Sequence, residues 1–564
     1  MLACLSYICW NRPHVVLSGD KPRNQATMAH DGDATAVPLL LSSAEPDATP
    51  GAPRRNMYAF ACATLASMTT ILMGYNLALM SGAQLFIRED LGLTDGEVEV
   101  LTGSMNVFML VSILVAGWAA DLLGRRGTLM LANAFLMAGA IAMSLGGSYA
   151  ELMAARFVTS VGAGFSRVIA PVYNAEISPA SSRGVLSSLL DIFINVGIML
   201  SYVSNYAFAG MPAHLGWRVM FAAGAIPPVF LAAAVHFMPE SPRWLAMRGR
   251  HGEACAVLMR TSDTQAEVEL RLEEIKQAAG APHPGGGGGG GAGGVWRKLL
   301  VQPSTSVRRI LTCVFGLQFF QHAVGIEAIL LYTPLVLKKA GMPSNGAVLV
   351  ATIAVGVVKT LFILVGTLFS DRLGRRPLLL ASTAGVAVTQ TLLALILCVG
   401  GATSALSAAA CLAAVLALVA AYSVGLGPVV LTYSTEIMPL QLRAQGTSLG
   451  TAVNRLTSGV VSMTFISLAG AVTMPGCFFL YGGVAVAGCA FMYVKLPETR
   501  GRSLENMERC SLPMPSDHDI GHVLHWGCLK FSHLTVHLLV VDCRMTIIPW
   551  SSWPFVSLGV TFAT

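Results

Sequence analysis

The chain has 564 residues, of which 54% are hydrophobic and only 12% are charged, and its formal net charge is +6. Too few polar side chains remain to cover the surface of a water-soluble protein of this size, so the composition predicts a membrane protein. The positive charge is spread over several loops and does not form one basic patch, so we expect no nucleic-acid partner.

The sequence contains twelve apolar windows, each close to the roughly 20 residues that a helix needs to cross the hydrocarbon layer. In chain order they cover residues 58–80, 98–120, 127–149, 152–174, 185–207, 217–238, 309–332, 346–369, 377–400, 405–431, 446–470 and 473–494. Apolar residues are continuous within each window and do not alternate with polar ones, which indicates helices and not barrel strands. We therefore predict an all-α membrane protein with twelve transmembrane helices.

These windows and the segments between them divide the chain into five parts. In order, the parts are a cytoplasmic, largely disordered N-terminus (1–57), a six-helix bundle (58–238), a cytoplasmic linker with a glycine-rich segment (239–308), a second six-helix bundle (309–496) and a cytoplasmic tail that is irregular after about residue 510 (497–564). No cleavable signal peptide is recognised before residue 58. We interpret residues 1–27 and 511–564 as variable additions or errors of gene prediction.

Basic residues gather in alternate loops, which sets the predicted orientation. The arginines concerned are Arg125, Arg126, Arg183, Arg243, Arg248, Arg250, Arg372, Arg375, Arg376, Arg443, Arg500 and Arg502. Because cytoplasmic loops carry an excess of Lys and Arg, we expect these loops and both termini to be cytoplasmic. The twelve cysteines have no framework spacing, and the sequence shows no metal-ligand cluster and no phosphate-binding glycine loop, so we expect neither an enzyme nor a cofactor.

Three short motifs occur once in each half of the chain, in the same order and at matching helix ends. The motif from Asp121 to Arg126 returns from Asp371 to Arg376, Glu176-Ile177-Ser178-Pro179 with Arg183 returns as Glu436-Ile437-Met438-Pro439 with Arg443, and Pro239-Glu240 with Arg243 returns as Pro497-Glu498. The two bundles are therefore predicted to be pseudo-symmetric repeats. Transporters built from such repeats hold their substrate between the repeats.

The repeated acids and arginines are candidates for a cytoplasmic gate, in which guanidinium forks clamp carboxylates. The gate residues are predicted to be Asp121, Arg125, Arg126, Glu176, Arg183, Glu240, Arg243, Asp371, Arg375, Arg376, Glu436, Arg443 and Glu498. The alternative is that the arginines only set topology and meet lipid phosphates. Topology alone does not require acids at fixed positions in both repeats, which favours the clamp.

Charged and titratable groups inside the apolar windows are costly, so each is a functional candidate. They are Arg156, Arg167, Asp191, His236, His322, Glu327, Lys359 and Arg455. The rise along a helix places His322 and Lys359 near mid-depth, with Glu327 within reach of a long lysine side chain. A second interpretation is that Lys359 pairs with Glu327 or Asp191 only to avoid an uncompensated charge in low dielectric.

With these motifs in place, residues 57–508 resemble the sugar-porter family of the major facilitator superfamily. Gly325-Ile326-Glu327, Lys359 and Asn454-Arg455 look most like the plant polyol and monosaccharide transporters. The resemblance implies the major facilitator fold and secondary transport of a polyol or monosaccharide by alternating access. It also implies proton symport and a monomer in the plasma membrane. The substrate-binding residues that it implies are Asp191, Gln321, His322, Glu327, Lys359 and Asn454.

The sequence departs from the family pattern at three places. Asn76 stands where proton-coupled relatives have an aspartate opposite Arg156, and an amide cannot release a proton near neutral pH. Asn76 and Arg156 therefore mark the proton-coupling region. Either the protein is a uniporter, or Asp191 or Glu327 carries the proton in place of the missing aspartate. Leu431 replaces a tryptophan and Ser458 an asparagine, and these losses leave a transport-inactive sugar sensor as a further alternative.

Overall fold

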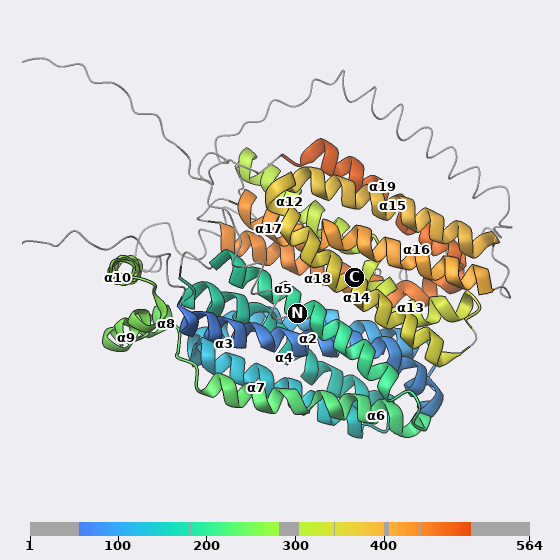
Figure 1. Cartoon of the computed structure of the whole chain (residues 1–564), viewed down its shortest axis with the longest axis horizontal. Coiled ribbons are helices and arrows are strands. Elements are labelled where there is room, and N and C mark those ends of the chain that lie inside the picture. The colour runs from blue at the N-terminus through green and yellow to red at the C-terminus, as the bar shows by residue number, and fades with distance from the viewer. Residues whose placement is uncertain are drawn as a thin grey trace, which may run out of the picture. The chain divides into compact units, whose positions relative to one another are not determined.

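The computed structural model describes residues 56–179, 183–280, 304–342, 344–399, 405–438 and 442–497, and the regular elements of these residues are α-helices (Figure 1). Predictions for residues 1–55, for the glycine run at 285–291 and for the tail from residue 498 onward lie outside these ranges.

One group of helices, here called the N-bundle, precedes the linker. It comprises α2 (Met57–Leu91), α3 (Asp95–Leu145), α4 (Tyr149–Ile177), α5 (Arg183–Ala207), α6 (Ala213–Gly224) and α7 (Ile226–His236). Three shorter helices follow, α8 (Pro242–Met247), α9 (His251–Thr261) and α10 (Gln265–Gly280). The second group, the C-bundle, comprises α12 (Thr305–Ala323), α13 (Ile326–Lys339), α14 (Asn345–Leu373), α15 (Arg375–Val399), α16 (Ala405–Val424), α17 (Leu426–Ile437), α18 (Arg443–Val472) and α19 (Met474–Lys495).

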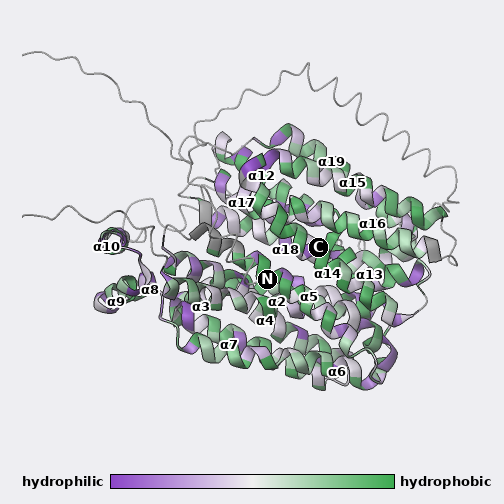
Figure 2. Ribbon diagram, viewed as in Figure 1, coloured by the Kyte–Doolittle hydropathy of each residue, from purple (hydrophilic) through white to green (hydrophobic). Residues whose placement is uncertain are grey.

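Eleven stretches of the described residues are helical, long and apolar enough to cross a membrane. One of them, α3, contains the predicted window 98–120 and most of the window 127–149, since it ends at Leu145. The two are joined through Gly124, whose φ of 83° and ψ of 170° are not helical. Each of the twelve windows thus falls on a membrane-length helix, and the prediction of a twelve-helix membrane fold is confirmed. Figure 2 shows hydrophobic residues along these helices.

Three windows that the sequence predicts as continuous helices are interrupted. The window 217–238 breaks at Ala225, which two prolines follow closely, and proline cannot donate the backbone bond that a helix needs. The window 309–332 breaks before Gly325, whose φ is 80°. The window 405–431 breaks at Gly425, where an added Cβ would lie 2.5 Å from the carbonyl oxygen of Leu378. Breaks of this kind place unpaired backbone groups inside the bundle, where side chains must satisfy them.

The two charged turns lie at the same end of the bundles. Glu99 on α3 contacts Ser467 on α18, and further along α3 Asn106 contacts Arg455, so these two helices run antiparallel. The first half of α3 ends at the turn that contains Gly124 and Arg125. This turn therefore lies at the same end of the molecule as the start of α18, near Glu436 and Arg375. We call this the motif end and the opposite end the far end.

Candidate functional site

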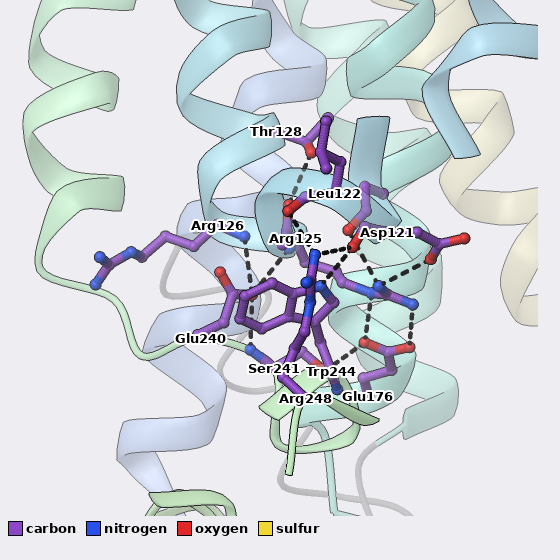
Figure 3. Close-up of polar contacts among 12 residues, drawn as sticks. Asp121, Leu122, Arg125, Arg126, Thr128, Glu176, Glu240, Ser241, Trp244 and Arg248 are labelled. Carbon is purple, nitrogen blue, oxygen red and sulfur yellow. Dashed lines mark hydrogen bonds and ion pairs between the residues drawn. The ribbon is translucent and has the colours of Figure 1, made fainter. Parts of the chain in front are cut away.

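In the N-bundle, the guanidinium of Arg125 binds the carboxylate of Glu176 through two of its nitrogens. Nε of Arg125 donates to Glu176 Oε2 over 3.0 Å, and Nη2 donates to Oε1 over 3.2 Å (Figure 3). The side chains are only 10% and 7% exposed, and Nη1 donates to the carbonyl of Ala120 and to Asp121. This bidentate ion pair links α3 to α4 at a position that is largely shielded from solvent.

Glu240 caps the turn between the two halves of α3. One carboxylate oxygen accepts the backbone N–H groups of Arg125 at 2.9 Å, Arg126 at 3.1 Å and Ser241 at 2.9 Å. A Cβ at Gly124 would lie 2.4 Å from the other oxygen, and its φ is positive. This position therefore needs glycine both for its backbone conformation and for the approach of the acid.

The linker helices pack against the same turn and satisfy its free carbonyl groups. The indole of Trp244 donates to the Asp121 carbonyl at 3.0 Å, and Arg248 donates to the carbonyls of Asp121 and Leu122 (Figure 3). Arg271 of α10 donates to the carbonyl of Glu176 at 2.8 Å. The end of the N-bundle is thus bonded directly to α8 and α10.

Two predicted gate arginines are not paired with an acid in the described part of the chain. Arg126 donates through Nη1 to the carbonyls of Met238 at 3.2 Å and His236 at 3.4 Å. Arg243 is exposed in the first turn of α8 and forms no hydrogen bond with another described residue. The side chains of Arg183, Asp371, Arg443 and Glu498 lie outside what the structure describes.

The C-bundle repeats the main ion pair. Arg375 donates to Glu436 at 2.8 Å and to the carbonyl of Ser370, as Arg125 does to Glu176 and Ala120. Arg376 donates to the carbonyl of Tyr493 at 2.8 Å, and its guanidinium lies 5.7 Å from the centre of that ring. The pair of Arg375 and Glu436 is more exposed than the pair of Arg125 and Glu176. The Arg375 side chain is 15% exposed and the Glu436 side chain is 24% exposed.

A tyrosine that the sequence analysis missed completes each motif. Tyr173 donates to the carbonyl of Pro239 at 2.9 Å, and Tyr433 donates to the carbonyl of Pro497 at 2.8 Å. Each tyrosine lies three residues before the glutamate of its own motif, so the spacing is a repeat signal that could have found them. The bonds attach the Pro-Glu segments to α4 and α17.

Midway along the helices, Gln321 connects α12 to the helix break at Gly425 and to α18. Its amide nitrogen donates to the carbonyl of Leu426 at 2.8 Å, directly after the break at Gly425. Its amide oxygen accepts from Asn454 at 2.6 Å. Asn454 in turn accepts Arg455 Nη2 at 2.7 Å. The predicted binding residues Gln321 and Asn454 therefore belong to one polar network.

Arg455 connects this network to the N-bundle. Its Nη1 donates to Asn106 on α3 at 3.3 Å, and its Nη2 lies 3.4 Å from His322 Nε2. The other ring nitrogen of His322 lies 3.4 Å from Glu327 Oε1. Arg455, His322 and Glu327 are each less than 10% exposed. Arg455, one of the charged candidates inside the apolar windows, thus joins the C-bundle to the N-bundle.

The remaining charged groups are divided between the two bundles. Lys359 is buried, and the opposite charge that acts on it is Glu327. Asp191 is half-buried, and Arg167, which no prediction explained, is the opposite charge that acts on it. Asp191 therefore sits on the N-bundle side with Arg167, whereas Lys359 shares the C-bundle side with His322 and Glu327.

Asn76 and Arg156 meet through the backbone. Arg156 Nη1 donates to the carbonyl oxygen of Asn76 at 3.1 Å, and the Asn76 side chain donates to the carbonyl of Leu72 at 2.9 Å. Arg156 is fully buried, and in the described part of the chain its hydrogen-bond partners are backbone carbonyls and not a carboxylate.

A two-bundle membrane fold with paired charged turns at one end and a polar network at mid-depth defines a multi-pass membrane transporter. The sequence model of the family described as "Sugar (and other) transporter" matches residues 62–510, and the chain belongs to this family. The chain is no enzyme, since the family and its members are transporters.

Relatives and solved structures agree with this assignment. The chain is 46% identical to "Polyol transporter 5" of Arabidopsis thaliana, covering 87% of this chain and 92% of that protein. It is 49% identical to "Putative polyol transporter 1" of the same plant, covering 80% and 91%. The proton:xylose symporter XylE bound to 6-bromo-6-deoxy-D-glucose is 26% identical, with a TM-score of 0.66 over 81% of this chain and 99% of that one. The inward-open structure of XylE from E. coli has a TM-score of 0.68 and 24% identity.

Proposed function

We propose that the protein carries a linear polyol or a monosaccharide across the membrane by alternating access, with Asp191, Gln321, His322, Glu327, Lys359 and Asn454 around the substrate. The observation that carries this proposal is the network of Gln321, Asn454 and Arg455, which joins a helix break of the C-bundle to Asn106 of the N-bundle. Ring or chain hydroxyls need several fixed donors and acceptors, and this network supplies both. The names of the relatives support a polyol.

Uptake into proteoliposomes tests the proposal directly. Radiolabelled sorbitol, mannitol, inositol and hexoses are offered, with and without a pH gradient, and counterflow is measured from preloaded vesicles. We expect saturable counterflow of at least one of these compounds. Binding without counterflow would favour the transport-inactive sensor, and neither binding nor flux from protein verified in the membrane would contradict the proposal.

The motif end is proposed to be the cytoplasmic gate, with both termini and the linker in the cytoplasm and the protein in the plasma membrane. Excess Arg at this end supports the orientation. Arg125 with Glu176, and Arg375 with Glu436, each brace one bundle, so that each moves as a rigid body. Breaking one pair would then change the population of conformations more than the choice of substrate.

We propose that Asn76 and Arg156 couple transport to protons only weakly, or that an acid elsewhere carries the proton. Buried Arg156 bonds the backbone of Asn76, and an amide has no proton to exchange, which favours a facilitative uniporter. Relatives of known structure include a proton:xylose symporter, so Asp191 and Glu327 remain the proposed substitutes.

Replacing Asn76 with aspartate should introduce accumulation driven by a pH gradient. The new carboxylate would lie on the residue whose backbone already binds the buried guanidinium of Arg156, and there the guanidinium and a proton can compete for the carboxylate. Accumulation ratios with and without the gradient are the measurement, and the matched control is Asn76→Ala. Equal pH dependence in the wild type and in Asn76→Asp would place coupling elsewhere.

A further inference from the structure

The bundles are joined by a small number of side chains, and these are unevenly distributed. Hydrogen bonds between described residues of the two bundles involve Gln84, Glu99, Asn106, Asn195 and Tyr202 on the N-bundle side. All of these lie in the middle of the helices or toward the far end. The bonds therefore hold the bundles together in a state that is closed at the far end.

Glu99 makes the densest of these contacts. Its Oε1 accepts the backbone N–H of Ile466 at 2.6 Å, and its Oε2 accepts the N–H of Ser467 at 3.1 Å. The hydroxyl of Ser467 also donates to Oε2. Glu99 is 1% exposed, so its charge is compensated mainly by these donors of the opposite bundle. Glu99 is not among the predicted functional residues, although it lies inside the second apolar window.

The N–H groups that face Glu99 belong to a turn of α18 that a second helix also contacts. Tyr332 of α13 donates to the carbonyl of Ser462 at 2.8 Å, and this carbonyl is the normal helical acceptor for the N–H of Ile466. The ring of Tyr332 also stacks on Phe465, with centroids 5.2 Å apart. The same turn of α18 is thus contacted by α13 at a carbonyl group and by Glu99 at N–H groups.

The contact continues from Glu99 toward mid-depth along one face of α3. A Cβ on Gly103 would lie 2.4 Å from the Met463 side chain, and one on Gly459 would lie 2.7 Å from Val107. The two helices therefore touch backbone to side chain along this face. The contact between α3 and α18 thus extends from Glu99 at the far end to Asn106 at the polar network.

We infer that Glu99 is the latch of the far end, a positioning residue that closes this end by accepting backbone N–H groups of α18 and must release them when the end opens. The inference rests on the proposed alternating access, because a latch has a role only if the end opens. Release separates the Glu99 carboxylate from the N–H groups of Ile466 and Ser467, so the charge must find other donors when the end opens.

The latch is tested by distance measurements without substrate. Spin labels are introduced through an unnatural amino acid at Glu89 and Gly470, because the chain has twelve cysteines of its own. Both positions are exposed at the far end, one on each bundle. A second label pair, at Met247 and Arg372, reports on the motif end.

Glu99→Gln should raise the ratio of long to short far-end distances about tenfold, because one lost charged hydrogen bond is worth roughly that factor. The amide nitrogen of the variant would face backbone N–H groups, and it cannot accept a hydrogen bond from them. Ser467→Ala removes only the hydroxyl and should give a smaller shift in the same direction. This second variant also serves if Glu99→Gln fails to reach the membrane.

Glu97→Gln is the matched control, since Glu97 lies two residues earlier on α3 and bonds only Thr94 of its own helix cap among the described residues. Unchanged distances in both latch variants would overturn the inference, and so would an equal shift in the control. The far-end distances do not depend on flux. A latch that responds in a protein without counterflow would therefore uphold this inference while the proposed transport fails.

Discussion

Replacing Arg125 with alanine should lower the free energy of unfolding by about 3–5 kcal/mol, which is typical for removing one partner of a buried ion pair. The variant leaves Glu176 charged in a place where its side chain is only 7% exposed. It also frees the carbonyl of Ala120, which accepts from the same guanidinium. Thermal unfolding of the purified protein in detergent, followed by tryptophan fluorescence, is the measurement.

Arg375→Ala provides the matched control in the other half of the chain. The pair with Glu436 is more exposed, so solvent screens the remaining charge better and the expected loss is smaller. Equal losses at the two positions would show that burial does not determine the contribution of the pair. No loss at Arg125 would contradict its role in bracing the N-bundle.

Replacing Lys359 with alanine should abolish counterflow and destabilise the protein, because Glu327, the opposite charge that acts on Lys359, would keep its charge in a buried site. Removing Lys359 and Glu327 together should restore most of the stability, since no uncompensated charge remains. The two single variants and the double variant form a cycle, measured by unfolding and by counterflow.

The cycle separates two roles for the pair. If the double variant recovers both stability and counterflow, Lys359 serves only to neutralise Glu327. If stability returns but counterflow does not, the pair contacts the substrate, as we propose. A loss in the double variant equal to the sum of the two single losses would show that the groups do not interact.

Much of the fold could be predicted because hydropathy, charge and repetition are local properties. The windows needed only a run of apolar residues, and the position of Arg125 at a helix end needed only the glycine before it. Arg125 and Glu176 were expected to meet from the recurrence of both residues in the second half. These features depend on short stretches of sequence, which tertiary packing does not alter.

The remaining features depend on which faces of distant helices meet. Glu99 looks like the loop acids just before it, and only its register against α18 shows that it joins the bundles. The bond from Gln321 to Leu426 exists because Gly425 interrupts a helix that composition predicts as continuous. Arg167 acts on Asp191, which lies on another helix. Hydropathy along one helix carries no information about such partners.

At the far end, two N-bundle side chains attach to the backbone of α13. Tyr202 donates to the carbonyl of Leu330 at 3.0 Å, and Gln84 donates to the carbonyl of Leu331 at 2.9 Å. Pro334 has no N–H to offer Leu330, so the first of these acceptors is free without any unwinding of the helix. Since main-chain oxygens are recognised, the identities of residues 330 and 331 are not read by these contacts. A substitution at either position that still packs in the core would thus keep this attachment, whereas a substitution at Pro334 would offer an N–H to the Leu330 oxygen within its own helix.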